Sequence, residues 1–285
     1  MKKIAAIHDL SGYGRASLTV AIPILSYMGY QVCPLPTAIL SAHSEYEHFR
    51  SFDLTDQMQP IIEHWKELQL HFDALYSGYL ASHRQMEIVS QFFHDFKTTD
   101  NFILVDPVLG DHGTLYPGLD QEMIQGMRQL CRQAKVITPN LTEAALLLGK
   151  TYRPDITPEE AFEWCQALGD LGPEFCIITS APTTTQNVAT IAYNKNDRRM
   201  WRVCCDYIPT SYPGTGDAFA SVITGCLLNN DSLPEALERA VHFINMGIKA
   251  TYGYDHNPLD GIQQEKVLHY LKEPLPYFTY EQILL

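Results

Sequence analysis

Short apolar runs alternate along this chain with longer segments in which apolar residues recur every three or four positions. The short runs have the length and composition of buried strands, and the longer segments have the period of helices that cover a sheet. The pattern predicts strands over 3–7, 31–39, 74–77, 102–105, 136–138 and 175–179, and helices over 15–28, 55–69, 83–96, 120–134, 141–148 and 158–168. We therefore expect an α/β fold, in which helices cover a central sheet.

Prolines interrupt the second of these runs. Pro34 and Pro36 both lie within 31–39. Proline cannot donate a hydrogen bond to a neighbouring strand, so within sheets it is confined to edges, strand starts and bulges. A regular central strand is therefore not expected over this run.

The pattern changes after residue 187. Strand-like runs over 188–193 and 200–207 flank the turn residues Lys195-Asn196-Asp197, which predicts an antiparallel hairpin near 187–207. Helical segments are predicted over 216–228, 233–251 and 263–271. No repeat, low-complexity tract or linker divides the chain, so we expect a single domain over 1–285.

The charge balance limits the possible partners. The chain has 285 residues and a formal net charge of -13. Nucleic acids and anionic membrane surfaces require a basic footprint, so neither is an expected partner. Phosphorylated small molecules stay open, because helix N-termini and Mg²⁺ bind phosphate inside acidic proteins.

The cysteines and the N-terminal run indicate a cytoplasmic protein. None of the seven cysteines forms a C-x-x-C pair, and an odd count suits a reducing compartment. The first apolar run ends at His8 and Asp9, which predicts a buried strand and not a signal peptide. No stretch approaches the roughly 18 apolar residues of a membrane span.

Two glycine segments have parts of nucleotide-binding motifs without the rest. Gly149-Lys150-Thr151 has the end of a P-loop, but Ala144 stands where its first glycine is required, so Gly149 is predicted to cap a helix. Gly12-Tyr13-Gly14 follows the first strand as a dinucleotide fingerprint does, but the third glycine and the acidic residue after the second strand are missing. This segment is predicted to form a tight turn that faces a ligand.

The segment Pro213-Gly214-Thr215-Gly216-Asp217 is more informative, because it precedes an apolar helix. Its two glycines let the backbone turn sharply and point successive N–H groups outward at a helix N-terminus. Such a site stabilises negative charge on a phosphoryl group. Asp217 would supply a base for a substrate hydroxyl, and the alternative is an ordinary N-cap aspartate.

With this segment in view, the chain resembles the ribokinase-like superfamily, and within it the pyridoxal (vitamin B6) kinase family. Four motifs in the family's order carry the resemblance through nearly the whole chain. They are 77–80 (SGYL), 106–111 (DPVLGD), 138–143 (TPNLTE) and 214–219 (GTGDAF), which are similar to S-G-Y-[LI], D-P-V-[ML]-G-D, T-P-N-x-x-E and G-[AT]-G-D-x-F. The resemblance implies a three-layer α/β/α sandwich with a mostly parallel sheet and an active site beyond the carboxyl ends of its strands.

The resemblance also implies ATP-dependent phosphoryl transfer to a hydroxymethyl group. Asp217 would take the proton of that hydroxyl. The backbone amides of Gly214, Thr215, Gly216 and Asp217 would hold the γ-phosphoryl charge. Phosphoryl transfer is mainly positioning and electrostatics, so these groups with Mg²⁺ are chemically sufficient.

The same resemblance implies which residues bind ATP and its metal ion. Asn140 and Glu143 stand three apart at a predicted helix start and would face Mg²⁺ and the phosphates of ATP, with Asp106 beside them. Thr179, at the end of a predicted strand, and Gly216 are further candidates for contact with ATP. The alternatives are a helix-start carboxylate for Glu143, a turn for Asp106 and a plain strand end for Thr179.

For the substrate, the resemblance implies contacts from five residues on the first turns and the S-G-Y segment. An aromatic ring and a few fixed polar groups suit a flat pyridine. The candidates are Asp9, Ser11, Thr37, His43 and Tyr79. Tyr79 as a core residue and His43 as a loop residue without a role are the alternatives.

Two departures from the family bear on the substrate. Asp9 stands where many pyridoxal kinases have serine, and it is similar to the G-S-D of hydroxymethylpyrimidine kinases. Those enzymes often have cysteine where this chain has Asp217, and the D-x-G-G-x-x-x-N stretch of sugar kinases is missing. We therefore expect a heteroaromatic alcohol as substrate: a vitamin B6 vitamer, with hydroxymethylpyrimidine as the alternative.

Two other classes of protein remain as hypotheses. One is a non-catalytic sensor of a vitamer or nucleotide on the same fold, and the other is an NAD-dependent oxidoreductase. The resemblance further implies a homodimer, and it leaves open whether a monovalent cation is required.

Overall fold

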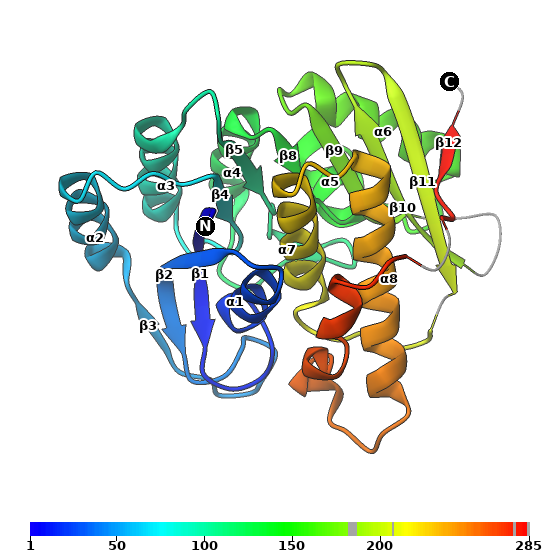
Figure 1. Ribbon diagram of the computed structural model, residues 1–285, viewed down its shortest axis with the longest axis horizontal. Coiled ribbons are helices and arrows are strands. Elements are labelled where there is room, and N and C mark those ends of the chain that lie inside the picture. The colour runs from blue at the N-terminus through cyan, green and yellow to red at the C-terminus, as the bar shows by residue number, and fades with distance from the viewer. Residues whose placement is uncertain (182–186, 207, 276–277, 284–285) are drawn as a thin grey trace.

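One mixed sheet forms the centre of the computed structural model, which describes residues 1–181, 187–206, 208–275 and 278–283 (Figure 1). Within those residues the sheet has ten strands in the order β12-β11-β10-β9-β8-β5-β4-β1-β2-β3. Its strands are β1 (Lys3–Ser11), β2 (Gln31–Leu40), β3 (Ser51–Asp53), β4 (Ala74–Ser77), β5 (Phe102–Val105), β8 (Val136–Ile137), β9 (Phe175–Ala181), β10 (Asn187–Asn194), β11 (Arg199–Asp206) and β12 (Glu281–Ile283).

The helices and a small second sheet complete the described chain. The helices are α1 (Leu18–Tyr27), α2 (Thr55–Glu67), α3 (His83–Phe96), α4 (Gln121–Gln133), α5 (Leu141–Leu148), α6 (Pro158–Asp170), α7 (Thr215–Leu228) and α8 (Leu233–Tyr252). Three short 3₁₀ helices follow as η1 (Pro258–Asp260), η2 (Gln264–Lys266) and η3 (Leu268–Leu271). Strands β6 (Gly110–Asp111) and β7 (Thr114–Leu115) pair only with each other.

The central strands are parallel, as the resemblance implied. Strands β2, β1, β4, β5, β8 and β9 pair in parallel, whereas β10, β11 and β12 continue the sheet antiparallel and β3 closes the other end. The antiparallel hairpin predicted near 187–207 is confirmed by the β10–β11 pairing. Parallel strands joined by helices all end at one edge, and that edge is where a ligand site is expected.

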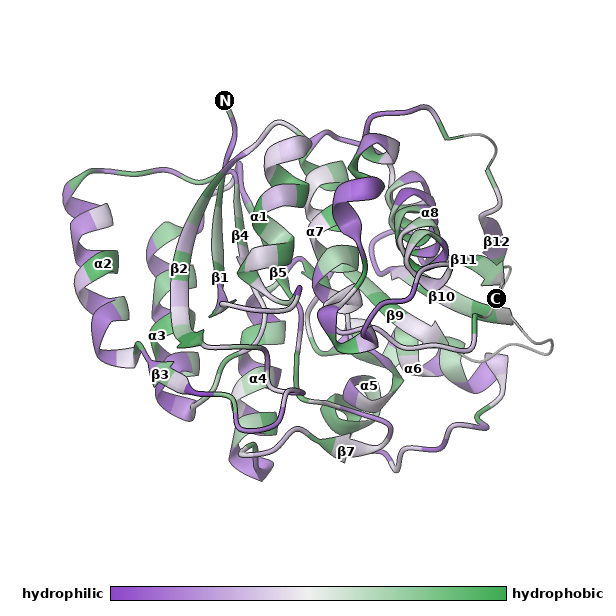
Figure 2. Cartoon of the chain, turned by 90° about the horizontal axis from the view of Figure 1, so that it is seen from below, coloured by the Kyte–Doolittle hydropathy of each residue, from purple (hydrophilic) through white to green (hydrophobic). Residues whose placement is uncertain are grey.

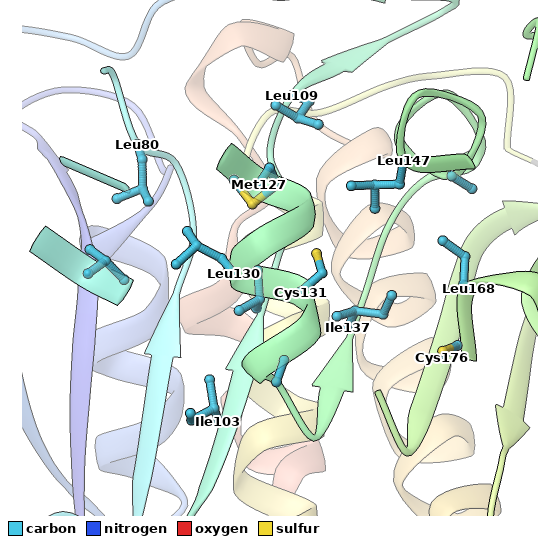
Figure 3. Packing of buried hydrophobic residues seen from close by; sticks show 14 of the residues in the cluster. Leu80, Ile103, Leu109, Met127, Leu130, Cys131, Ile137, Leu147, Leu168 and Cys176 are labelled. Atoms are coloured by element: carbon cyan, nitrogen blue, oxygen red, sulfur yellow. The ribbon is translucent and has the colours of Figure 1, made fainter. Parts of the chain in front are cut away.

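Two buried apolar clusters cover the two faces of the sheet. Neighbouring residues of β1 serve opposite clusters, since successive side chains of a strand alternate between faces. Ile4 belongs to the cluster that includes residues of α1, α7 and α8, and Ala5 belongs to the cluster that includes residues of α2 to α6. Figure 3 shows Leu130 and Cys131 of α4 over the sheet, and Figure 2 shows both layers of helices from below. The predicted α/β/α sandwich is confirmed.

Local capping residues explain several helix boundaries. Helix α5 begins in a reciprocal capping box between Asn140 and Glu143, and it ends at Gly149, whose φ of 67° is left-handed. The predicted cap role of Gly149 is therefore confirmed. Similar boxes start α6 and α8.

The prolines of β2 act as expected, and one predicted helix is wrong. Strand β2 is not a regular central strand: among the described residues Pro34 and Pro36 pair only with β1, and the β1–β2 register shifts between Pro36 and Ile39. Segment 263–271 forms η2 and η3 in place of one helix, because Val267, with φ -118°, separates them. The sequence reading also missed the β6–β7 hairpin. Among the described residues, no helix has the length and apolarity needed to cross a membrane.

Candidate active site

The carboxyl ends of the parallel strands bring the predicted site residues to one edge of the sheet. Asp9 lies near the end of β1, Asp106 follows β5, and Thr179 lies near the end of β9. The N-terminus of α7 meets the same edge, since a Cβ added at Gly216 would lie 4.0 Å from Oδ2 of Asp106. Residues far apart in the sequence therefore form one site.

Asp217 lies in the first turn of α7 and is largely withdrawn from water, with its side chain 14% exposed. Its Oδ2 accepts a 2.8 Å hydrogen bond from the backbone N–H of Ser17. Burial raises the pKa of Asp217 to about 8, and the negative charges of Asp106 and Asp9 add to the shift. This carboxyl group can accept a proton near neutral pH.

The turn before α7 has the conformation of an anion site. Gly214 has a left-handed φ of 76°, and a Cβ there would come within 2.2 Å of the carbonyl oxygen of Arg15. The first intrahelical bond runs from the N–H of Ala218 to Gly214. Within the described residues, the preceding amides of Thr215, Gly216 and Asp217 have no acceptor, and no side chain caps the helix. These N–H groups are available to an anion.

The nucleotide-side candidates form a connected polar group. The hydroxyl of Thr138 donates a 2.8 Å hydrogen bond to Asp106. Burial raises the pKa of Asp106 to about 7, although this hydrogen bond acts to lower it. Glu143 accepts hydrogen bonds from the amides of Leu109 (3.1 Å) and Asn140 (2.8 Å). Burial raises the pKa of Glu143 well above its usual range, and the charge of Asp106 adds to this shift. The helix-capping alternative for Glu143 therefore holds, and the same carboxyl group also acts electrostatically on Asp106.

Asn140 and Thr179 lie side by side on the same edge. The side chain of Asn140 accepts from the amide of Glu143 and donates to the carbonyl of Gly110 at 2.9 Å, so both ends of its amide bond to the protein. Thr179 forms a parallel bridge with Asn140, and its N–H donates to Pro139. Asn140 therefore lies beside Glu143, and Thr179 lies beside Asn140.

The pair Asp106 and Glu143 fits a cation that arrives with a nucleotide. Two buried carboxyl groups that repel each other gain from a positive charge between them. Among the described residues, no group of three or more His, Cys, Asp or Glu side chains is arranged to hold a metal. Mg²⁺ is commonly held by one or two carboxylates together with substrate phosphates, so this donor set fits Mg²⁺.

On the substrate side, Asp9, Ser11 and Tyr79 come together. Asp9 is buried and accepts hydrogen bonds from the hydroxyls of Ser17 (2.5 Å) and Ser11 (3.3 Å). Burial raises the pKa of Asp9 and of Tyr79, and the charge of Asp9 contributes to the shift of Tyr79. Thr37 is also buried, and within the described chain its hydroxyl has no partner. Such a hydroxyl is free to bind a ligand.

His43 lies on the loop between β2 and β3. Its Nε2 is 2.5 Å from the carbonyl oxygen of Leu259, and its ring packs 4.7 Å from that of Tyr46. The Tyr46 hydroxyl donates to Asp260. A Cβ at Gly14 would come within 2.3 Å of the His43 ring, so this loop packs on the first turn.

Several residues of the site were missed by the sequence reading. Ser17 and His8 contact Asp217, and Thr138 bonds Asp106. Thr138 could have been identified from the sequence, because it is the first residue of the T-P-N motif. The contacts of Ser17 and His8 depend on the approach of α7, which no local pattern indicates.

Comparison with known proteins gives the family. The family model described as phosphomethylpyrimidine kinase matches residues 48–260. A candidate phosphomethylpyrimidine kinase from Bacteroides thetaiotaomicron is 55% identical over 99% of this chain and 98% of that one, with a TM-score of 0.97. Its orthorhombic form, solved with pyridoxal, covers 99% of both chains with a TM-score of 0.96.

Two relatives are named as pyridoxal kinases. The structure of pyridoxal kinase from Lactobacillus plantarum is 32% identical over 95% of this chain and 96% of that one, with a TM-score of 0.87. Pyridoxal kinase PdxY from Burkholderia lata is 26% identical over 88% of this chain and 90% of its own length. The chain therefore belongs to the ribokinase-like phosphomethylpyrimidine kinase family, together with these pyridoxal kinases.

Proposed function

We propose that this protein is an ATP-dependent kinase that phosphorylates the hydroxymethyl group of pyridoxal, pyridoxamine or pyridoxine. The observation that carries the proposal is Asp217 beside the free amides of Thr215 and Gly216 at the start of α7. A base and an anion site thus lie within one helical turn. The 55% identical relative was solved with pyridoxal, which supports this substrate class.

In the proposed reaction, the hydroxyl oxygen of the vitamer forms a bond to the γ-phosphorus, and the bond from that phosphorus to the leaving ADP oxygen breaks. Asp217 takes the hydroxyl proton. Its raised pKa suits this role, because a base works best when its pKa is near the working pH. The N–H groups of residues 214–217 would stabilise the charge on the transferred group.

Asp106 and Glu143 would hold Mg²⁺ on the nucleotide side. Bound there, the ion would neutralise charge on the ATP phosphates. Asn140 and Thr179 would order this edge, since Asn140 already ties α5 to Gly110. Asp9, Ser11, Thr37, His43 and Tyr79 would contact the vitamer ring and its substituents.

Hydroxymethylpyrimidine kinase is the second candidate. The matching family model bears the name phosphomethylpyrimidine kinase, and Asp9 departs from the serine of many pyridoxal kinases. Both candidate substrates are heteroaromatic alcohols, so the same base and anion site would serve either one.

An ADP-release assay with Mg·ATP and each of pyridoxal, pyridoxamine, pyridoxine and hydroxymethylpyrimidine tests the proposal. We expect release with a B6 vitamer, and a loss of about 10²- to 10⁴-fold in Asp217→Asn, because a general base is removed. Asp120→Asn is the matched control, since Asp120 is an ordinary N-cap aspartate of α4. Vitamer binding without ADP release would indicate a sensor, and preferential release with hydroxymethylpyrimidine would favour the second candidate.

A homodimer and a cytoplasmic location stay predictions, and the need for a monovalent cation is an open question. Size-exclusion chromatography with light scattering tests the homodimer. The ADP-release assay in potassium, sodium and tetramethylammonium buffers answers the question of the cation.

A further inference from the structure

His8 of β1 is a buried polar residue that the reaction as described does not use. Its side chain is 0% exposed, and within the described chain neither ring nitrogen has a hydrogen-bond partner. A buried polar group without a partner costs free energy relative to one that is paired. The position of this imidazole therefore needs a physical reason.

The ring is held tightly and points at the proposed base. It packs edge-on against Tyr76, with 4.3 Å between ring centroids. A Cβ added at Gly78 would come within 2.2 Å of Nδ1, so the ring fits only because residue 78 is glycine. Nδ1 lies 3.8 Å from Oδ1 of Asp217, slightly beyond hydrogen-bond distance.

The second oxygen of Asp217 has a different partner. Oδ2 accepts the N–H of Ser17 at 2.8 Å, whereas Oδ1 has no hydrogen bond within the described residues. The hydroxyls of Tyr76 and Ser221 donate to the backbone carbonyl of Asp217, and not to its carboxyl group. The carboxyl groups of Asp9 and Asp106 repel its charge. Among these side chains, His8 is the one able to donate an N–H to Oδ1.

The charge state of His8 agrees with a donor role. Burial lowers the pKa of His8 to about 3, so the imidazole is neutral at working pH and carries one N–H. With the proton on Nδ1, that N–H faces Asp217. The proton of the substrate would then stay on Asp217 after transfer, since the ring does not readily take a second one.

We propose that His8 is a positioning residue, which donates its Nδ1–H to Oδ1 of Asp217 in the charged, reactive state. Together with the N–H of Ser17, this bond would fix the plane of the carboxylate and leave a lone pair of Asp217 directed at the hydroxyl of the substrate. The inference rests on the proposed kinase function.

Two substitutions separate this role from simple space filling. His8→Leu fills the same apolar surroundings without a donor, and His8→Gln keeps an N–H donor on a side chain of similar reach. His8→Leu removes the proposed hydrogen bond to the charged carboxyl group of Asp217. The loss of such a bond corresponds to a decrease of about 10- to 100-fold in kcat. The KM values for vitamer and ATP should change less than about threefold, because the bond acts on the base and not on binding. His8→Gln should recover most of kcat.

Thr224→Val is the matched control, because it removes a buried hydroxyl from the same helix α7 without facing the base. We expect its kcat to equal that of the wild type. Wild-type kcat in a folded His8→Leu variant, or a His8→Gln variant as slow as His8→Leu, would overturn the role of His8 and leave the kinase function intact. A wild-type protein that releases no ADP with any of the four alcohols would overturn both proposals.

A measurement on the unaltered ring covers the case in which His8→Leu fails to fold. ¹⁵N NMR of histidine-labelled protein, recorded above the pKa of Asp217 so that its carboxyl group is charged and assigned by the signal lost in His8→Gln, should show the proton on Nδ1 and an unprotonated Nε2. Protonation on Nε2 would leave only a lone pair facing Asp217 and would overturn the proposal.

Discussion

The backbone N–H of Ser17 donates a 2.8 Å hydrogen bond to Oδ2 of Asp217, across 200 residues of chain. The hydroxyl of the same serine donates to Asp9 at 2.5 Å. Ser17 thus connects the proposed base to a carboxyl group on the substrate side. Its φ of 55° and ψ of -127° are unusual for a residue other than glycine, so the connection is made in a strained conformation.

Two substitutions at Ser17 should distinguish the effect of its hydroxyl on stability from the effect of its strained backbone. Ser17→Ala removes the donor to Asp9 and keeps the strain, so we expect a loss of about 1–3 kcal/mol in the free energy of unfolding. Ser17→Gly also removes the donor but adopts positive φ freely, so its loss should be smaller by roughly 1 kcal/mol. Urea denaturation of both variants measures the difference. Equal losses would show that the positive φ stores no strain.

Gly214 and Gly216 should respond differently to the same added methyl group. Gly214→Ala places Cβ within 2.2 Å of the Arg15 carbonyl at a φ of 76°, so both stability and activity should fall. At Gly216 the nearest atom lies 4.0 Å away, so Gly216→Ala should fold with a near wild-type midpoint. Its methyl group stands beside Asp106, so its kcat should still fall. Thermal denaturation together with ADP release tests the pair, and equal stability of the two variants would contradict it.

The local parts of the fold could be predicted from the sequence because their signals are local. The predicted bounds of α3 and α5 agree with the structure, since amphipathic spacing and the capping residues Ser82 and Asn140 define them. The motif residues Asp106 and Asp217 were placed at one site by the family resemblance of their motifs, and the end of a predicted parallel strand before Asp106 agrees with that placement. The helix bounds needed only neighbouring residues.

The remaining parts depend on contacts between distant segments. Ser17 meets Asp217 of α7, and Tyr46 meets Asp260 of η1. The intervening sequence gives no sign of either pair. The φ of 55° at Ser17 is not helical, so α1 begins at Leu18, where its apolar spacing starts, and not at residue 15 as predicted. Tertiary packing decides such positions, and local propensity does not.

The contact of Tyr46 with Asp260 should affect substrate binding more than turnover. It joins the loop of His43 to η1, whose Asp260 carbonyl also accepts the N–H of Arg15 at 3.1 Å. Tyr46→Phe should therefore loosen His43 and raise the KM for the vitamer about fivefold, which corresponds to roughly 1 kcal/mol for one hydrogen bond. Steady-state kinetics measures this change. Tyr254→Phe, at a 60% exposed tyrosine, is the control, and a KM unchanged in Tyr46→Phe would contradict the role of the contact.

The raised pKa of Asp217 predicts that the charged form of this carboxyl group, which is the form that acts as a base, destabilises the folded protein. Its pKa is about 8 in the folded protein against 3.8 for an ordinary aspartate, mainly through burial. The folded chain thus holds this proton more tightly than the unfolded chain. The resulting stability is fully present below about pH 3.8 and is lost as pH rises through about 8. Asp217→Asn cannot ionise, and its carbonyl oxygen can still accept the N–H of Ser17.

We therefore expect the stability of Asp217→Asn relative to wild type to increase from pH 4.5 to 8.5, a range set by the same two pKa values. Urea midpoints measured without nucleotide and with EDTA test this. Asp95→Asn is the control, and its difference from wild type should stay nearly constant over this range. Partial burial opposes the shift at Asp95, but its bonds to Lys66 and Gln91 lower its pKa below 3.8, so Asp95 is charged in both the folded and the unfolded chain across the range. If the Asp217→Asn difference stays constant with pH, the carboxyl group is not buried as described, and its assignment as a base poised near neutral pH fails with it.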